Sequence, residues 1–288
     1  MKFGMNLGSA RHSIAEAFGT ANIFTGEADL ILIRLLRVPL PFILAHPEKS
    51  LSAEELSSID EIVARRLSGE PLQYILGEAY FWGIPFEVGE GVLIPRPDTE
   101  FLVESALKRL PPDAPSFFLD WGTGSGCITI ALLTERPKAR AIMAEKNPRS
   151  IEWAQKNLNH HGLCERASLR HSRELDDIFC ASEKGSLDLI VSNPPYIPAK
   201  DISGLMREVR DHEPHMALDG GDDGMDFYRK LLHGAPALLK NGGSLIMEIG
   251  DAIQAKTMRN EKHSNLVLAE EIADFSGIPR CMVWERRL

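Results

Sequence analysis

The fold of this chain is decided by one short stretch, Asp120-Trp121-Gly122-Thr123-Gly124-Ser125-Gly126. The apolar run at 117–122 predicts a strand, and the segment at 127–136 predicts a helix. A glycine turn between a strand and a helix is typical of ligand-binding loops in open α/β sheets, because glycine lets the backbone turn tightly and approach a ligand. A dinucleotide fingerprint would need its third glycine at Cys127, and no G-x-x-x-x-G-K-[ST] motif lies nearby. The loop is therefore related to the dinucleotide-binding loop but distinct from it.

Short apolar runs continue to alternate with helical patterns downstream of this loop, which predicts a mostly parallel sheet with helices on both faces. The last 23 residues hold two β-rich runs separated by a Ser-Gly-Ile-Pro turn, too short for a parallel crossover, so we expect an antiparallel hairpin at the sheet edge. The fold class is therefore α/β, a Rossmann-like open sheet. The further predicted strands are 140–145, 167–172, 187–192 and 242–250, and the further helices are 148–162 and 227–240.

The chain upstream of the sheet has a different character. Residues 1–77 have helical periodicity, and Ser52 with Glu55 forms a capping-box signature at the start of a helix. Residues 78–96 contain short apolar stretches broken by glycines, which predicts a β-hairpin. We therefore expect a small all-α domain (1–77), a hairpin linker (78–96) and a sheet domain (97–288).

Composition narrows the class of partner. The chain has 288 residues with 32 Lys and Arg against 41 Asp and Glu, a net charge of −9. Surfaces that bind nucleic acid through phosphates are basic, so no stable nucleic-acid partner is expected. No apolar stretch approaches the ~18 residues of a membrane helix, and no targeting signal is evident. The spacing of the four cysteines forms no regular disulfide framework, which favours free thiols in a reducing compartment. They are Cys127, Cys164, Cys180 and Cys281. We expect a cytoplasmic monomer.

An acidic residue stands at the end of the second predicted strand of the sheet. Glu145 lies 25 residues after Asp120, where a carboxylate can accept hydrogen bonds from both hydroxyls of a ribose. The loop and Glu145 together indicate a nucleoside-bearing ligand. The alternative is an ordinary tight turn with a surface glutamate. No metal is expected. His212 and His215 flank Glu213, but Pro214 prevents the helical pairing that a zinc-binding H-E-x-x-H motif requires.

A rigid corner follows the strand at 187–192. It consists of Asn193, Pro194, Pro195 and Tyr196. The two prolines restrict the backbone, so the carbonyls of Asn193 and Pro194 can point outward beside the flat ring of Tyr196. Two acceptors and an aromatic ring suit a planar substrate that carries an NH₂ group. The alternative is a proline-rich turn that only ends a strand.

These motifs resemble those of class I S-adenosylmethionine-dependent methyltransferases that act on planar amino groups. Several further segments resemble the protein-(glutamine-N5) methyltransferases of peptide chain release factors, the HemK/PrmC family. The resemblance runs from about Ala28 to the end of the chain, including the helical amino-terminal domain. The matching segments are 70–77, Leu93-Ile94-Pro95-Arg96-Pro97-Asp98-Thr99-Glu100, 208–214 and 217–221.

The resemblance implies a function and a set of site residues. S-adenosylmethionine would be the cofactor and S-adenosylhomocysteine its product, and the substrate would be the glutamine of the Gly-Gly-Gln motif of class I release factors. Asn193, Pro194, Pro195 and Tyr196 would bind the glutamine, and Asn193, Pro194 and Tyr196 would be catalytic. The helical domain would help to dock the release factor. The implied cofactor-binding residues are Gly122, Thr123, Gly124, Ser125, Gly126, Glu145 and Asn193.

The sequence departs from the family at three places. Glu145 stands where the family has aspartate, and Trp121 stands where a small or aliphatic residue is usual. Arg173 and Glu174 stand at the end of the third predicted strand, where an aspartate followed by an aromatic residue is usual.

Three other functions use the same motifs. A sister family methylates a glutamine of a ribosomal protein and shares the Asn-Pro-Pro-Tyr corner. An adenine-N6 DNA or RNA methyltransferase would stack a flipped base on Tyr196. A nucleoside-binding regulatory module would use only the glycine loop. The net charge of −9 counts against DNA, and the intact corner counts against a module.

Overall fold

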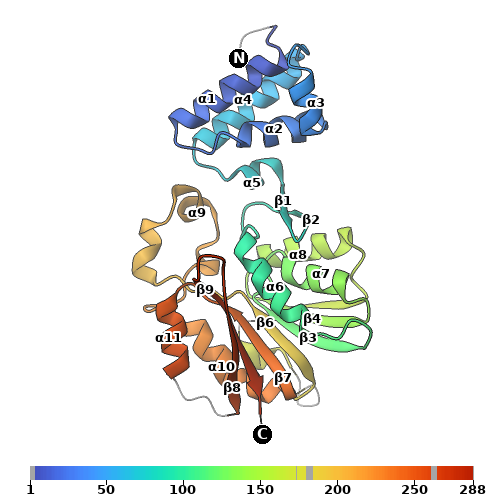
Figure 1. Ribbon diagram of the computed structural model, residues 1–288, viewed down its shortest axis with the longest axis vertical. Coiled ribbons are helices and arrows are strands. Elements are labelled where there is room, and N and C mark those ends of the chain that lie inside the picture. Colours follow the sequence, from blue (N-terminus) through green and yellow to red (C-terminus); the bar gives the residue numbers. More distant parts are fainter. Residues whose placement is uncertain (1–3, 173, 180–183, 261–264, 288) are drawn as a thin grey trace. The chain divides into compact units, whose positions relative to one another are not determined.

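The computed structural model describes residues 4–172, 174–179, 184–260 and 265–287. It divides into two compact units, each with its own core (Figure 1). One unit holds Met1–Gly77 together with Arg207–His212, and the other holds Glu78–Met206 together with Glu213–Leu288. Arg173 and Cys180, which the sequence singled out, lie outside the described residues.

The first unit is helical. Its core is a cluster of fully buried apolar side chains that includes Phe18, Ile31 and Ile59, brought together by amphipathic helices. The predicted capping box is confirmed: Glu55 N–H donates to Ser52 Oγ at 3.1 Å, and Ser52 N–H donates to Glu55 Oε2 at 2.7 Å. The helices are α1 (Leu7–Thr20), α2 (Glu27–Leu36), α3 (Leu40–Ala45), α4 (Ala53–Leu67), α5 (Leu72–Leu76) and α9 (Arg207–His212).

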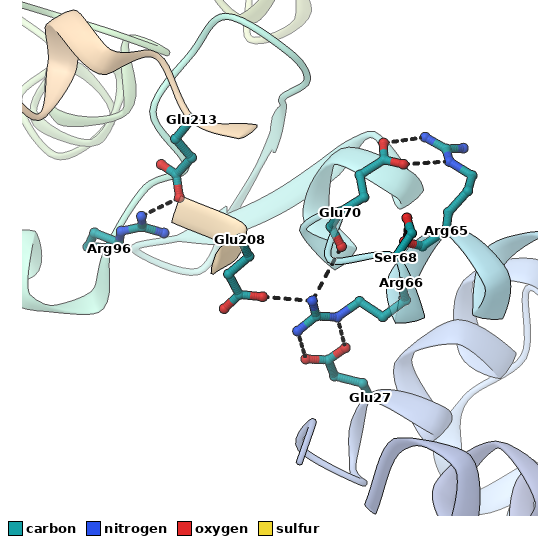
Figure 2. Close-up of polar contacts among 8 residues, drawn as sticks. All are labelled: Glu27, Arg65, Arg66, Ser68, Glu70, Arg96, Glu208 and Glu213. Atoms are coloured by element: carbon teal, nitrogen blue, oxygen red, sulfur yellow. Dashed lines mark hydrogen bonds and ion pairs between the residues drawn. The ribbon is translucent and has the colours of Figure 1, made fainter. Parts of the chain in front are cut away.

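A buried guanidinium attaches α9 to the rest of this unit (Figure 2). The Arg66 side chain is only 8% exposed, and it donates to both oxygens of Glu27, at 2.6 and 3.0 Å. It also forms an ion pair with Glu208 of α9 at 2.7 Å and donates to the Glu70 carbonyl at 3.3 Å. One arginine on α4 therefore binds carboxylates from two other helices. Its neighbour Arg65 pairs with Glu70 at 2.5 Å but is 41% exposed.

The second unit contains the sheet. In the part of the chain described, its strand order is β5-β4-β3-β6-β7-β9-β8, preceded in the chain by the hairpin of β1 (Glu78–Phe81) and β2 (Ile84–Glu87). The strands from β5 to β7 in this order are mutually parallel. The strand β9 pairs antiparallel with both β7 and β8, which confirms the predicted sheet with an antiparallel hairpin at its edge. The strands are β3 (Ser116–Trp121), β4 (Ala139–Glu145), β5 (Ala167–His171), β6 (Leu187–Ser192), β7 (Leu239–Glu248), β8 (Leu266–Ala273) and β9 (Pro279–Arg286).

The direction of the connections places helices on both faces of the sheet. From β3 the chain moves outward to β4 and β5, whereas from β6 it moves the opposite way to β7. Parallel crossovers are right-handed, so opposite directions put their helices on opposite faces, as Figure 1 shows for α7 and α8 against α10. The order therefore reverses between β3 and β6. The helices of this unit are α6 (Glu100–Leu107), α7 (Cys127–Glu135), α8 (Pro148–His160), α10 (Asp226–Leu238) and α11 (Ala252–Asn260).

Helices on both faces of the sheet explain why most residues of the central strands are apolar. Leu119 on β3 and Ile190 on β6 are fully buried, and they belong to one large core cluster. Several elements differ from the prediction. The helix α10 ends at Leu238, two residues after Pro236, and β7 spans Leu239–Glu248 where a strand at 242–250 was predicted. The helix α11 was not predicted. None of the helices in the described ranges has the length and apolar character needed to cross a membrane.

The two neighbouring arginines of α4 make a matched pair for testing the helical unit. Replacing Arg66 by methionine should destabilise the chain by about 3–5 kcal/mol, because Glu27 and Glu208 would be left without their buried counter-charge. Arg65→Met should lower the free energy of unfolding by no more than about 1 kcal/mol, since its pair with Glu70 is half-exposed. Urea unfolding of the full chain followed by circular dichroism measures both. Equal losses would contradict the assignment of Arg66 as the buried link.

Candidate active site

The two predicted motifs meet at the point where the strand order reverses. The parallel pairing of Phe118 with Leu189 and of Asp120 with Val191 brings the carboxyl ends of β3 and β6 side by side. Ser192 Oγ donates to the Trp121 carbonyl at 2.7 Å, which joins the last residues of the two strands, just before the two loops begin. Ligands of open α/β sheets bind at such a reversal.

A cavity of ≈ 320 Å³ opens between these loops, at the small end of the usual range for ligand pockets. Most of the predicted site residues line it: Gly122, Thr123, Gly124, Ser125, Glu145, Asn193, Pro194 and Pro195. Gly126 and Tyr196 do not line it. The sequence did not predict the other walls as site residues, and these include Leu93, Pro95, Thr99, His215, Met216 and Phe227.

The three loop glycines have different roles. Gly122 (φ +76°) and Gly124 (φ +57°) both have left-handed backbones, and a Cβ on either would meet no atom within 4 Å. Both therefore present bare backbone to open space in the cavity. At Gly126 (φ +84°) a Cβ would lie 2.8 Å from Met143 Cε, so this glycine allows the loop to pack closely on β4.

A buried carboxylate supports the loop from below. Asp120 Oδ2 accepts hydrogen bonds from Thr123 Oγ1 at 2.7 Å and from Thr129 Oγ1 at 2.8 Å. Burial raises the pKa of Asp120 to about 6, and the two threonine hydroxyls act against that rise. Asp120 therefore holds the loop and the first turns of α7 together.

Glu145 reaches back onto the glycine loop. Its Oε2 accepts from Gly124 N–H at 2.9 Å, and its Oε1 accepts from the N–H groups of Lys146 and Asn147, both at 2.8 Å. A carboxylate has about four acceptor positions, and three are in use. Binding both hydroxyls of a ribose therefore requires Glu145 to release at least one backbone donor.

The Asn193 side chain has a fixed partner on one side only. Its Nδ2 donates to Thr99 Oγ1 at 3.0 Å, and Thr99 Oγ1 donates to Glu248 Oε2 at 2.7 Å. Among the described residues none donates to Asn193 Oδ1 or to the Pro194 carbonyl. The corner therefore offers the two acceptors that the sequence predicted.

Tyr196 lies behind the corner. Its ring packs against Gly250, where a Cβ would come within 2.7 Å of Tyr196 Cδ2, and its carbonyl accepts from Gln254 Nε2 at 2.8 Å. Burial, and after it the nearby carboxylate of Glu248, raise the pKa of the phenol well above its ordinary value. Its predicted contact with the substrate stays a prediction.

Arg96, which belongs to one of the segments that resemble the family, pairs with a protein carboxylate. Its guanidinium contacts Glu213, whose side chain is 1% exposed (Figure 2). Glu213 Oε2 also accepts from Ile94 N–H at 3.3 Å. Glu213 thus joins the wall formed by residues 93–96 to the wall that begins at His215.

Comparison with known proteins identifies the family. Residues 9–77 match the family described as PrmC N-terminal domain, and residues 98–209 match the methyltransferase small domain. A release factor glutamine methyltransferase of Geobacter sulfurreducens is 47% identical over 211 residues, covering 73% of this chain and 71% of that protein. One of Bradyrhizobium diazoefficiens is 37% identical over 286 residues, covering 97% and 94%. This chain belongs to the release factor glutamine methyltransferase family.

Solved structures support the fold of this family member. The hMettl16 catalytic domain superposes with a TM-score of 0.56 at 14% identity, covering 81% of this chain and 82% of that one. A methyltransferase from Pyrococcus furiosus superposes with a TM-score of 0.51 at 18% identity, covering 78% and 98%. At such low identity these likenesses show the methyltransferase fold alone.

One titratable group of this methyltransferase lies directly behind the corner. Glu248 is 3% exposed, and burial raises its pKa from 4.5 to about 7. The hydrogen bond from Thr99 and the positive charge of Arg280 lower the pKa of Glu248, whereas the negative charge of Asp98 raises it further. Between about pH 4.5 and 7 the folded chain thus keeps a proton that the unfolded chain has released, so this group makes the fold less stable as the pH rises.

The variant Glu248→Gln isolates this effect. The wild type should lose stability relative to the variant by an amount on the order of 3 kcal/mol as the pH rises from about 4.5 to 7, because glutamine does not ionise. Denaturant unfolding of both proteins across this range measures the difference. Glu152→Gln, at an exposed position of α8, is the control for the change from glutamate to glutamine. A flat difference for Glu248→Gln would contradict the raised pKa.

Proposed function

We propose that this chain transfers the methyl group of S-adenosylmethionine to the side-chain amide nitrogen (N5) of the glutamine in the Gly-Gly-Gln motif of class I release factors. The observation that carries the proposal is the Asn193 corner, since Asn193 and Pro194 line a cavity beside the glycine loop and the amide of Asn193 has its NH₂ end bound to Thr99. The family of the chain supports the same substrate.

The free thiols of Cys127, Cys164 and Cys281 suit a reducing compartment, and we propose a cytoplasmic monomer.

The residues around the cavity suit this cofactor. Gly122 and Gly124 leave open space where side chains would otherwise stand, and the buried Ser125 Oγ lacks a partner among the described residues. Glu145 retains about one unused acceptor position and can gain others by releasing backbone donors. Bound S-adenosylmethionine supplies a methyl group on a sulfonium, which is already electrophilic. Gly122, Thr123, Gly124, Ser125, Gly126, Glu145 and Asn193 are the residues proposed to hold it.

The protein's task is to prepare a poor nucleophile. An amide nitrogen shares its lone pair with its own carbonyl, the resonance that keeps amide groups planar. Asn193 Oδ1 and the Pro194 carbonyl each accept one N–H of the glutamine, which fixes the direction of the nitrogen. Both contacts strengthen as positive charge develops on that nitrogen. The methylated amide cation loses its proton readily, so no strong general base is required.

Glu145 is predicted to carry much of the affinity for the cofactor. Glu145→Ala should weaken S-adenosylmethionine binding by about 10- to 100-fold, because hydrogen bonds to a charged group contribute roughly 1.5–3 kcal/mol. Isothermal titration calorimetry measures the dissociation constant. The exposed Glu152→Ala, on α8 of the same unit, is the control and should bind normally. Unchanged binding by Glu145→Ala would remove this residue from the site.

One assay separates the candidate substrates. The protein is incubated with labelled S-adenosylmethionine and, in parallel, with a class I release factor, a ribosomal protein and duplex DNA. We expect label on the release factor alone and none when its motif glutamine is replaced by alanine. Asn193→Ala should lower the rate at least about 100-fold, since one of the two polar contacts to the reacting amide is lost.

Each other outcome of this assay rejects the proposal. Label on the ribosomal protein would indicate the sister family, and label on DNA alone would indicate an adenine methyltransferase. Label on no acceptor would favour a nucleoside-binding module. A wild-type rate for Asn193→Ala would overturn the proposed role of the corner.

A further inference from the structure

We propose that Thr99 and Glu248 form a positioning relay, which determines which end of the Asn193 side-chain amide faces the acceptor pocket. The relay rests on the proposed function, since it matters only if the carbonyl of Asn193 must receive an N–H from the substrate. Neither residue was singled out by the sequence as part of the site.

The relay joins three segments that are far apart in the sequence. Asn193 follows β6, Glu248 ends β7, and Thr99 ends the short 3₁₀ turn Pro97–Thr99 before α6. The pairing of Ser192 with Met247 holds the first two ends next to each other. The hydrogen bonds from Asn193 to Thr99 and from Thr99 to Glu248 then span 94 and 149 residues of chain.

The direction of these hydrogen bonds follows from the chemistry of the groups. Above its pKa of about 7 the carboxyl of Glu248 is ionised and only accepts, so at such a pH the single hydroxyl proton of Thr99 is donated to Glu248 at 2.7 Å. The Thr99 oxygen is left with lone pairs alone and can only accept from its other neighbour. The NH₂ end of Asn193 can supply that donor, whereas its carbonyl end cannot. Asn193 Oδ1 must therefore lie on the opposite side of the amide.

The burial of Thr99 and Glu248 makes this orientation of the Asn193 amide strongly preferred. Thr99 is 2% exposed and Glu248 is 3% exposed, so bulk water has little access to supply a substitute donor or acceptor. If the amide were reversed, a carbonyl oxygen would face the lone pairs of Thr99. At the same time the NH₂ of Asn193 would face the NH₂ of the substrate glutamine. Both contacts are repulsive, so the relay keeps Asn193 in its accepting orientation before the substrate arrives.

Thr99→Val removes the hydroxyl and keeps the shape of the side chain. We expect kcat for release-factor methylation to fall at least about tenfold, because the Asn193 amide loses its preferred direction. The dissociation constant of S-adenosylmethionine should stay within about twofold of the wild type. Thr99→Ser retains the hydroxyl and should restore most of kcat. The matched control is Thr134→Val on α7, whose hydroxyl donates only to the Ile130 carbonyl of its own helix.

A second measurement is independent of methyl transfer. The side-chain NH₂ signals of Asn193 in a ¹H–¹⁵N spectrum, assigned from their absence in Asn193→Ala, should exchange slowly with solvent in the wild type and in Thr99→Ser. They should exchange faster in Thr99→Val. Glu248→Gln provides a variant of similar volume in case Thr99→Val does not fold. Its amide can donate or accept, so it should lower kcat and speed the same exchange.

The outcomes separate the relay from the proposed function. If the wild type methylates no release factor, the proposed function fails, and the exchange measurement still tests the hydrogen bond. The relay is overturned if Thr99→Val keeps wild-type kcat, or if Thr99→Ser is as impaired as Thr99→Val. Unchanged exchange of the Asn193 NH₂ in both Thr99→Val and Glu248→Gln overturns it as well.

Discussion

The parallel pairing of β3 with β6 is the constraint on which the site depends. It sets the carboxyl ends of the two strands side by side, and the chain continues from them into the glycine loop and the Asn193 corner. Right-handed crossovers that leave in opposite directions carry the helices to opposite faces and leave a crevice above these two strand ends. The cofactor loop and the acceptor corner become neighbours because of this topology, not because of any short-range signal.

Two buried carboxylates hold the loops of this crevice in place. Asp120 binds the hydroxyls of Thr123 and Thr129 beneath the glycine loop, and Glu248 binds the hydroxyl of Thr99 behind the acceptor corner. Burying a carboxylate is unfavourable, as the raised pKa values of both groups show. In each case threonine hydroxyls offset part of that penalty. The buried acids therefore contribute local rigidity more than overall stability.

The groups around the corner are held in place in two ways, by a restricted backbone and by hydrogen bonds to distant segments of the chain. Pro194 and Pro195 restrict the backbone by themselves, whereas Asn193 needs an outside partner to fix its amide. Glu213 plays a similar part for the walls, since it contacts Arg96 and the Ile94 N–H from the segment that precedes His215. Rigid backbone and long-range hydrogen bonds together give the pocket a defined shape before ligands bind.

The sequence by itself determined the β/α order, the antiparallel edge hairpin, the helical first unit and the two motifs of the site. These features arise from local periodicity, from glycine and proline, and from chain segments of a few residues, so they are visible without a fold. Only the tertiary structure decided the partners of the motifs. Thr99 and Glu248 contact the corner, and Arg66 binds α9, across separations that no local pattern encodes. Such contacts depend on which strands pair and which helices pack, and that is settled by the burial of the whole core.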